Sequence, residues 1–286
     1  MVIGASGAIG RFALPRLLAA GHDVLAVSRA PRASVDPHLR WEVGDLDSPP
    51  PPLPVLEAIF SLGPLDAFAR WFARADIAGA PRVIAFGSMS VDTKRGSSDA
   101  DERALADRLQ QAECTLIGAA DARGCAWTIL RPTLIYGAGI DRSLTPIAHF
   151  AQRWHAFPRI AGAHGLRQPV HADDLAAACL GVLTHPQTAA HIYPLGGGEQ
   201  LSFSAMLERV HASLATWSVP LPIPLGVARA LIKVARRPRF PGLRPAALER
   251  LTRDLVVDHS AAIADFGWAP RPFHPTSASW TAAPTR

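Results

Sequence analysis

Short apolar runs alternate with longer segments of helical spacing over the first 135 residues. The short runs are typical of buried strands, and the longer segments repeat apolar residues at the spacing of an amphipathic helix. Strands are predicted at 1–3, 23–28, 40–43, 57–62, 82–87 and 126–130, and helices at 8–20, 64–78 and 101–123. This alternation predicts βαβ units and an α/β fold, a Rossmann-type doubly wound parallel sheet.

The alternation weakens after Gly137, and the tail from Gly196 is rich in proline. Helices are predicted at 142–155 and 173–184, and strands at 168–171 and 191–195. We therefore expect two parts, each made of separate stretches of chain. Residues 1–135 and 168–195 would form the dinucleotide-binding core, and residues 136–167 and 196–286 a smaller C-terminal substrate lobe.

Composition narrows the functional classes. Apolar residues make up 49% and charged residues 19% of the chain, which excludes a disordered protein, and its many Ala, Pro and Arg residues are typical of a GC-rich bacterial genome. The net charge of +5 suits a small anionic ligand rather than nucleic acid, because the densest basic run, 233–244, is better explained as a solvated turn. Three cysteines without CxxC spacing predict no disulfide framework, no metal site and a cytoplasmic location. The apolar stretch 221–235 is too short and too rich in proline and charge for a transmembrane segment; it would form a lobe helix or lie on a membrane surface.

A glycine-rich motif, GASGAIG at 4–10, stands between a predicted strand and a predicted helix. Glycine lets the backbone turn tightly and approach a pyrophosphate, which the first amides of the helix then bind. The motif therefore predicts a dinucleotide site at Gly4, Ser6, Gly7, Ala8, Ile9 and Gly10. Only three residues precede Gly4, so either the first strand is short or upstream residues are missing.

The end of the second strand predicts which dinucleotide binds. An acidic residue there would hold the ribose hydroxyls of NAD, but Ser28 and Arg29 occupy the place, with Arg32 close behind. Because arginine matches a phosphate dianion, we predict NADP(H); the alternative is that these are ordinary loop arginines. Asp45, after the third strand, would accept a hydrogen bond from the adenine amine or simply stabilise a turn.

Six segments together resemble one known family, the extended short-chain dehydrogenases/reductases and the NAD-dependent epimerase/dehydratase group. They are GASGAIG at 4–10, GDL at 44–46, FGSMSV at 86–91, LRPTLIYG at 130–137, PVHADDLA at 169–176 and DFGWAPRPF at 265–273. They follow the order of the family and span nearly the whole chain. The resemblance implies a Rossmann core with a C-terminal substrate lobe, and a homodimer through the helix at 101–123.

The resemblance also implies roles for individual residues. Asp45 and Leu46 of the GDL segment, Leu62 and Gly63 would border the cofactor, and Pro132, Thr133 and Leu134 would meet the nicotinamide amide through their backbone. Ser88 would hydrogen-bond the reacting oxygen, and Arg167 would contact a substrate phosphate. Tyr136 and His171 are better explained by packing, and Asp173 and Asp174 by helix capping.

The tyrosine and lysine that perform proton transfer in this family are absent. Tyr136 and Tyr193 are the only tyrosines and Lys94 and Lys233 the only lysines, and none forms a Tyr-x-x-x-Lys pair. If Glu113 is the family glutamate, the pair falls at Leu105 and Leu109, which we expect to be packed. General acid–base help of this kind contributes roughly 10²–10⁴ in rate. In a reduction Ser88 or water would donate the proton; Asp92, Asp99 or Asp101 would replace the base, and Lys94, in the loop after the fifth strand, is a candidate electrophile.

Three functions stay open from the sequence. The first is an NADPH-dependent reductase of an unknown small molecule, possible without the pair because reduction requires a proton donor rather than a strong base. The second is a non-catalytic NADP-binding sensor or assembly protein. The third is a nucleotide-sugar epimerase with a substitute base, so the substrate would be a small molecule that could be linked to a nucleotide.

Overall fold

A computed structural model describes residues 1–48, 53–224, 226–227 and 250–282. The prolines at 49–52, most of the apolar stretch 221–235 and all of the basic run 233–244 lie outside these residues. Within the described ranges, no helix is long and apolar enough to cross a membrane.

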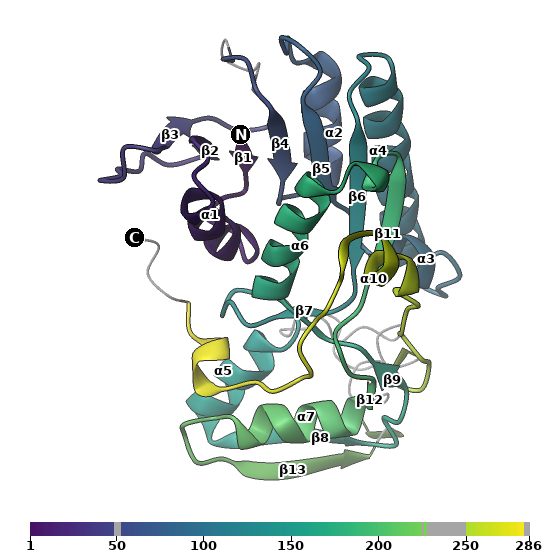
Figure 1. Cartoon of the computed structure of the whole chain (residues 1–286). Helices are drawn as coiled ribbons and strands as arrows, with labels where there is room; N and C mark the ends of the chain where they lie inside the picture. The colour runs from purple at the N-terminus through teal and green to yellow at the C-terminus, as the bar shows by residue number, and fades with distance from the viewer. Residues whose placement is uncertain (49–52, 225, 228–249, 283–286) are drawn as a thin grey trace.

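A seven-stranded parallel sheet forms the larger part of the molecule (Figure 1). Its strands are β1 (Val2–Ile3), β2 (Val24–Ser28), β3 (Leu39–Val43), β4 (Ala58–Ser61), β5 (Arg82–Phe86), β6 (Trp127–Pro132) and β11 (His191–Leu195). Their order is β11-β6-β5-β4-β1-β2-β3, so the chain reverses direction across the sheet between β1 and β4. Ligands of open α/β sheets bind at such a reversal, beyond the carboxyl ends of the strands. The predicted Rossmann-type sheet is confirmed.

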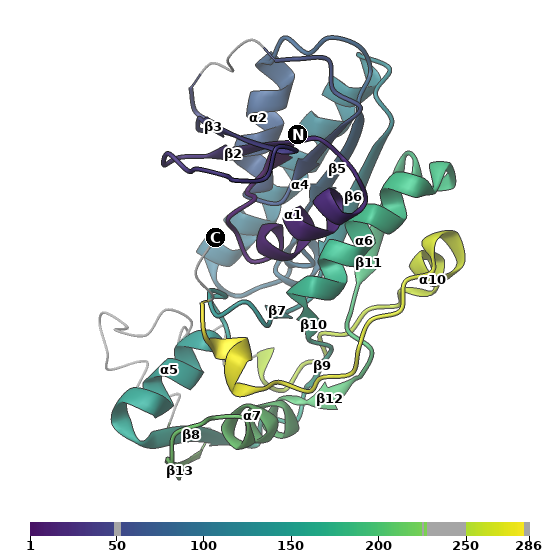
Figure 2. The same cartoon turned by 60° about the vertical axis from the view of Figure 1, so that its left-hand side comes forward.

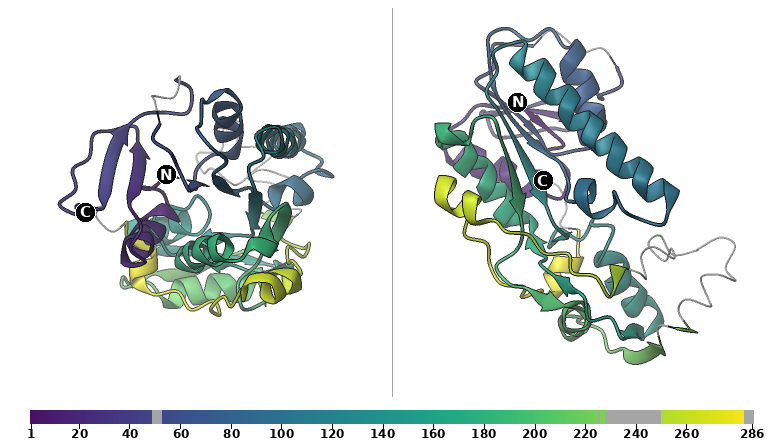
Figure 3. Two further views of the ribbon diagram at one scale, coloured as in Figure 1. Left: turned by 45° about the horizontal axis from the view of Figure 1, so that its top comes forward. Right: turned by 90° about the vertical axis from the view of Figure 1, so that its right-hand side faces the viewer.

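Helices cover both faces of this sheet, as Figure 3 shows. α1 (Gly10–Ala19) and α6 (Ala172–Thr184) pack together on one face, and α2 (Leu65–Arg74) and α4 (Ala100–Asp121) on the other. α2 places Phe68 and Phe72 on its buried side, as its spacing of apolar residues predicts. α4 begins where the carboxylate of Asp99 accepts a hydrogen bond from the Asp101 amide at 2.8 Å.

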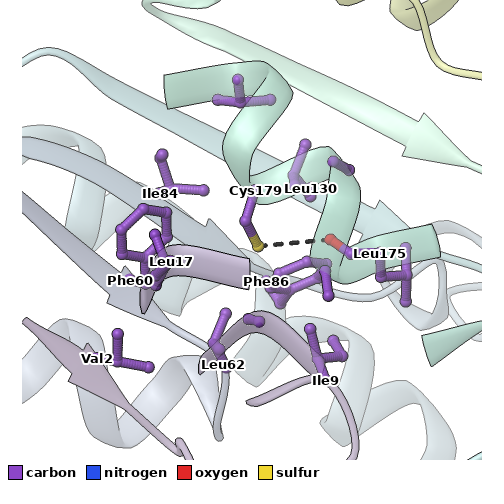
Figure 4. Packing of buried hydrophobic residues seen from close by; sticks show 14 of the residues in the cluster. Val2, Ile9, Leu17, Phe60, Leu62, Ile84, Phe86, Leu130, Leu175 and Cys179 are labelled. Carbon is purple, nitrogen blue, oxygen red and sulfur yellow. Dashed lines mark hydrogen bonds between the residues drawn. The ribbon is translucent and has the colours of Figure 1, made fainter. Parts of the chain in front are cut away.

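The core on the α1 and α6 side reaches up to the glycine motif. Figure 4 shows Ile9 and Leu62 beside Phe86 and Leu175, with the Cys179 thiol donating to the Leu175 carbonyl at 3.4 Å. Because the side chains of Ile9 and Leu62 are buried in this cluster, these residues have only their backbone to offer to a ligand.

The smaller lobe lies below the carboxyl edge of the sheet (Figures 1 and 2). Its described residues form three two-stranded sheets, which pair β7 (Ile135–Tyr136) with β10 (Val170–His171), β9 (Leu166–Arg167) with β12 (Leu201–Ser202), and β8 (Ala156–Ala161) with β13 (Val219–Pro224). Its helical segments are α5 (Thr145–Trp154), α7 (Phe203–Ala212) and the 3₁₀ turn at Ser277–Trp280. α10 (Ser260–Phe266) returns to the sheet beside β11, and the short α3 (Ser90–Thr93) and the 3₁₀ turn at Pro186–Thr188 complete the described elements.

Strands β8 and β13 were not predicted from the sequence. For β13 the reason is that proline, which argues against a strand, occupies every second position, at 220, 222 and 224. Among the described residues β13 pairs only with β8, and the Val219 amide donates to the His155 carbonyl at 2.9 Å. In a parallel ladder the amides of alternate residues point toward the partner, so the prolines fall where amides would point away. The strand therefore keeps its ladder and loses only donors on its free edge.

Candidate functional site

The glycine motif forms a tight turn between β1 and α1. Gly4 has a φ of +82°, a conformation that favours glycine, and its carbonyl accepts a hydrogen bond from the Gly7 amide at 2.9 Å. A Cβ added at Gly10 would lie 2.2 Å from the Gly4 oxygen and 2.5 Å from the Ala5 oxygen. The backbone therefore requires glycine at Gly4 and Gly10.

Backbone amides at the start of α1 are the groups that this turn presents. Within the described part of the chain, no hydrogen bond occupies the amides of Ala8, Ile9 or Gly10. Ser6, Gly7 and Ala8 are partly exposed on the turn. Free amides and the positive end of a helix dipole at the carboxyl edge of the sheet fit a pyrophosphate.

Two arginines lie beside the turn, of which the sequence identified only one. Arg32 donates from Nε to the buried Ser28 hydroxyl at 3.3 Å, and its guanidinium lies 5.3 Å from the centre of the Trp41 ring. Burial, and then the positive charge of Arg32, lower the pKa of Arg11 in the first turn of α1. Arg11 and Arg32 are therefore close enough to repel, and an anion between them would relieve that repulsion. Arg29 is exposed next to this group.

Asp45 stabilises its own turn. Its carboxylate accepts hydrogen bonds from the amides of Ser48, at 2.6 Å, and Asp47, at 2.9 Å, which lower its pKa, and the charge of Arg29 adds to this. The neighbouring Leu46 packs against the core on the α2 side. That Asp45 also accepts a hydrogen bond from the adenine amine remains a prediction.

Two other predicted segments meet the same edge of the sheet. The backbone of Leu62 and Gly63 approaches the turn so closely that a Cβ at Gly4 would lie 3.0 Å from each. After β6, Thr133 donates from its amide to the Leu195 carbonyl at 2.9 Å, and the Leu134 carbonyl accepts from the Val170 amide at 2.8 Å. Pro132 is buried beside them.

An ion-pair network of Arg131 with Glu113 and Asp92 lies next to α4, the helix on which the tyrosine and lysine of the family are expected. Arg131 donates from Nε to the Glu113 carboxylate at 2.8 Å and from its fork to Asp92 at 3.0 Å. The Glu113 side chain is only 4% exposed, and the hydrogen bonds that Arg131 donates to its carboxylate raise the pKa of Arg131. Glu113 also borders Gly87, where a Cβ would lie 2.8 Å from its Oε1. Glu113 and Asp92 are therefore engaged with the same arginine.

Leu109 and Leu105 follow Glu113 on the same stripe of α4, one and two turns closer to the start of the helix. Both are half-buried rather than fully packed. Ser88, two residues after the end of β5, is also half-buried, and its hydroxyl accepts a hydrogen bond from the Ser90 amide at 3.1 Å. The side chains at both positions of the missing tyrosine–lysine pair are therefore apolar.

A second charged group lies one turn beyond Leu105. The Glu102 carboxylate, with its side chain 8% exposed, accepts from the Ser97 hydroxyl at 2.8 Å, pairs with Arg250, and lies 4.0 Å from the Lys94 ammonium. Burial alone would raise the pKa of Glu102, but hydrogen bonds from Arg250 and Ser97 lower it. No local pattern in the sequence points to Glu102, since acidic residues are ordinary in a first helical turn.

Arg167 is buried in the lobe and bound to backbone. Its guanidinium donates to the carbonyls of Leu166 at 2.7 Å, Arg253 at 2.9 Å and Arg250 at 2.7 Å, and it lies over the Phe203 ring. Burial lowers the pKa of Arg167 to about 10. In this arrangement Arg167 holds the segment that carries Arg250, and its contact with a substrate phosphate stays a prediction.

Tyr136, His171, Asp173 and Asp174 make packing, capping and ion-pair contacts within the protein. Tyr136 is buried, with its ring at right angles to His171 at 5.0 Å, and burial raises its pKa to about 12. The His171 ring, rather than an aspartate, caps α6 by accepting from the Asp173 amide at 3.1 Å. Asp173 and Asp174 instead bind Arg271, each at 2.7 Å. In the described residues no group of histidine, cysteine and acidic side chains has the makings of a metal site.

No protein-family model matches the chain. Among curated proteins it is 29% identical over 120 residues to NADH dehydrogenase (ubiquinone) 1 alpha subcomplex subunit 9, mitochondrial, of Dictyostelium discoideum, over 40% of this chain and 33% of the relative. It is 22% identical over 160 residues to UDP-glucose 4-epimerase of Vibrio cholerae, over 56% of this chain and 47% of the relative. The matches span less than half the length of these relatives.

Solved structures extend the likeness to nearly the whole chain. A short-chain dehydrogenase/reductase superfamily protein from Agrobacterium tumefaciens with bound NAD aligns with a TM-score of 0.66 and 16% identity, over 96% of this chain and 92% of that chain. The expected resemblance to the short-chain dehydrogenase/reductase and epimerase proteins is confirmed, and at this identity it shows the fold.

Proposed function

We propose that the chain binds NADP(H) and is an atypical short-chain reductase of a small molecule. The observation that carries this proposal is the pair Arg11 and Arg32 beside the glycine turn. The free amides of the turn suit the pyrophosphate that all nicotinamide dinucleotides share, while two guanidiniums whose charges repel each other suit the additional phosphate that distinguishes NADP from NAD. The Agrobacterium protein of the same fold binds NAD, which supports the dinucleotide but not the choice between the two.

Calorimetric titration with NADPH and NADH tests this assignment. We expect NADPH to bind the wild type more tightly, and Arg32→Ala to weaken NADPH by about tenfold or more while leaving NADH unchanged, because a charged hydrogen-bond partner contributes roughly 1.5–3 kcal/mol. Arg40→Ala is the matched control, since Arg40 is exposed on β3 and pairs with Glu42. Tighter binding of NADH by the wild type would contradict the proposal.

The reduction would proceed without a tyrosine. Bound NADPH would supply a hydride to a carbonyl carbon of the substrate. The carbonyl oxygen must then take a proton, which we assign to the Lys94 ammonium that Glu102 holds; Ser88 would hydrogen-bond the same oxygen. The products are an alcohol, NADP⁺ and a neutral Lys94 amine that regains its proton from water. Asp92 is paired with Arg131 and is the weaker candidate.

Consumption of NADPH with a panel of carbonyl, enone and nucleotide-sugar compounds tests the reductase. We expect turnover with one class, and a fall of roughly 10²–10⁴ in rate for Lys94→Met, because that is the usual contribution of general acid catalysis. Failure of every compound to cause NADPH oxidation would contradict it.

A second function is favoured by Leu105 and Leu109, whose apolar side chains occupy the catalytic positions. On this alternative the chain is a non-catalytic NADP-binding sensor or assembly protein, and one curated relative is named as a subunit of NADH dehydrogenase. Stoichiometric NADP(H) that purifies with the protein and is never consumed would favour it.

A third function, a nucleotide-sugar epimerase with a substitute base, follows from the likeness to UDP-glucose 4-epimerase. It requires Arg167 to leave its backbone partners or to bind a phosphate in addition to them. UDP-glucose should then raise the melting temperature, since a ligand that binds only the native state stabilises it. The absence of any shift would remove this alternative.

A further inference from the structure

The turn between α3 and α4 brings an ammonium and a buried carboxylate together. Lys94 directly follows α3, and its carbonyl accepts a hydrogen bond from the Ser97 amide at 3.1 Å. The Ser97 hydroxyl in turn donates to the carboxylate of Glu102, in the first turn of α4, at 2.8 Å. The Lys94 ammonium lies 4.0 Å from Oε1 of Glu102, and the Lys94 side chain is 22% exposed. The ammonium is therefore held beside one carboxylate oxygen while it remains accessible to a solute.

A second cation reaches the same carboxylate from the lobe. Arg250 donates to Oε2 of Glu102, the oxygen that also accepts from Ser97, whereas Lys94 faces Oε1. Burial raises the pKa of Glu102, and the hydrogen bond from Arg250 is the largest of the effects that lower it, ahead of the charge of Lys94. Glu102 therefore has one negative charge to divide between two cations.

The backbone of the lobe fixes the position of Arg250. The Arg167 guanidinium donates to the carbonyls of Arg250, at 2.7 Å, and Arg253, at 2.9 Å. Gly165 lies so close to this segment that a Cβ added there would be 2.4 Å from the Arg253 oxygen. Burial, and then the charge of Arg250, lower the pKa of Arg167, so the two guanidiniums lie close enough to repel. The carboxylate of Glu102 offsets that repulsion where the lobe meets α4.

Two other arginines near the turn have partners of their own. Arg95 donates to the Gln110 side chain at 2.9 Å, and Arg103 donates to backbone carbonyls of the turn at 2.7 and 3.1 Å. Among the residues that the structure describes, Lys94 and Arg250 are thus the cations that share this carboxylate.

Two cations that share one carboxylate weaken each other's attraction to it. A neighbouring carboxylate favours the protonated form of an amine, and a neighbouring cation opposes it. We propose that Arg250 is a positioning residue that draws part of the Glu102 charge away from Lys94. The Lys94 ammonium would then release its proton readily only when the lobe is docked on α4. The use of that proton rests on the proposed reductase, whereas the sharing of Glu102 can be measured without turnover.

Acylation with acetic anhydride at pH 8 measures the sharing, because only the neutral amine reacts. The chain has two lysines, Lys94 and Lys233, and peptide mass spectrometry follows each separately. We expect Glu102→Gln to acylate at Lys94 about fivefold faster or more, because even in water a unit charge about 4 Å away changes an equilibrium by roughly this factor. Arg250→Met should acylate at Lys94 about threefold slower or more, because Glu102 would then attract Lys94 alone.

The matched controls alter an ion pair between β8 and α7. Arg159→Met and Glu208→Gln make the same chemical changes at a pair that includes neither Lys94 nor Glu102. Both variants should acylate at Lys94 at the wild-type rate. A circular dichroism spectrum unchanged from the wild type checks that each variant folds.

The opposite signs separate sharing from a purely structural role. If the two contacts only held the turn in shape, both variants would expose Lys94 and acylate faster, and this result, or an unchanged rate in either variant, would overturn the proposal. Rates that change as expected, without NADPH oxidation by any compound, would support the sharing and contradict the reductase. Where a compound is reduced, Arg250→Met should lower kcat and leave the Kd for NADPH unchanged; an unchanged kcat would overturn the positioning role.

Discussion

Gly10→Ala tests whether the turn between β1 and α1 has room for any side chain. The new Cβ would lie 2.2 Å from the Gly4 oxygen and 2.5 Å from the Ala5 oxygen. Both atoms belong to the backbone, so no side chain can move aside and the first turn of α1 must shift. Overpacking of this kind costs about 1–3 kcal/mol, against which alanine regains roughly 0.5–1 kcal/mol in helix propensity.

The shift would also displace the amides proposed to bind the pyrophosphate. We therefore expect Gly10→Ala to lower the free energy of unfolding by about 1–2 kcal/mol in urea titration and the melting temperature by roughly 2–8 °C. Calorimetry should show NADPH and NADH weakened together, in contrast to the selective loss expected for Arg32→Ala.

Gly118→Ala is the matched control for the added methyl group. Gly118 lies on the exposed side of α4, where a Cβ would have no atom within 4 Å. This variant should gain about 0.5–1 kcal/mol in stability, because alanine loses less backbone entropy in a helix than glycine does. If Gly10→Ala were as stable as Gly118→Ala and bound NADPH like the wild type, the turn would not have the constraint that we describe.

Two further variants test the ion pairs and the helix cap. Arg131→Met leaves the Glu113 carboxylate buried without its partner and should lower the free energy of unfolding in urea by about 3 kcal/mol, whereas Asp92→Asn, at an exposed pair, should cost less than about 1 kcal/mol. His171→Asn keeps an acceptor for the Asp173 amide but removes a ring whose pKa burial, and then the charge of Arg271, lower. Below about pH 6.5 the His171 ring takes up a proton in the unfolded chain more readily than in the folded chain. The free energy of unfolding of the wild type, relative to that of His171→Asn, should therefore fall as the pH drops below this value. Urea titrations at several pH values measure this difference.

The sequence predicted the parts of the fold that depend on local pattern. The glycine turn, the strands of the large sheet and α4 all have a signal within a few residues, in the form of glycine spacing, apolar runs or helical periodicity. Strand β13 escaped because Pro220 and Pro222 argue against a strand, and only its position at an edge makes them tolerable. That position is a property of the whole lobe and cannot be recognised from the segment.

The residues of the candidate site also divide into those that have a local sequence signal and those that have none. The missing tyrosine and lysine were evident from counting alone, and Arg32 from its place after the second strand. Arg11 had a weak signal, as a basic residue directly after the last glycine of the motif. Glu102 had none, because its burial depends on Arg250, which is 148 residues away in the chain. Long-range pairs of this kind need the tertiary structure.

The geometry of α4 shows what a substitute for the missing pair would require. One face of α4 carries, from the strands toward the start of the helix, Glu113, Leu109, Leu105 and Glu102. This face is therefore charged next to the strands, apolar over the next two turns, and charged again in the first turn of α4. Glu102 lies three residues before Leu105, about 4.5 Å farther along the helix axis from the strand edge. Proton transfer supported by Glu102 would therefore act on a substrate held closer to the lobe than the tyrosine position allows. Because Arg250 reaches Glu102 from a segment that Arg167 holds by its carbonyls, the charge of Glu102 depends on the lobe being in place.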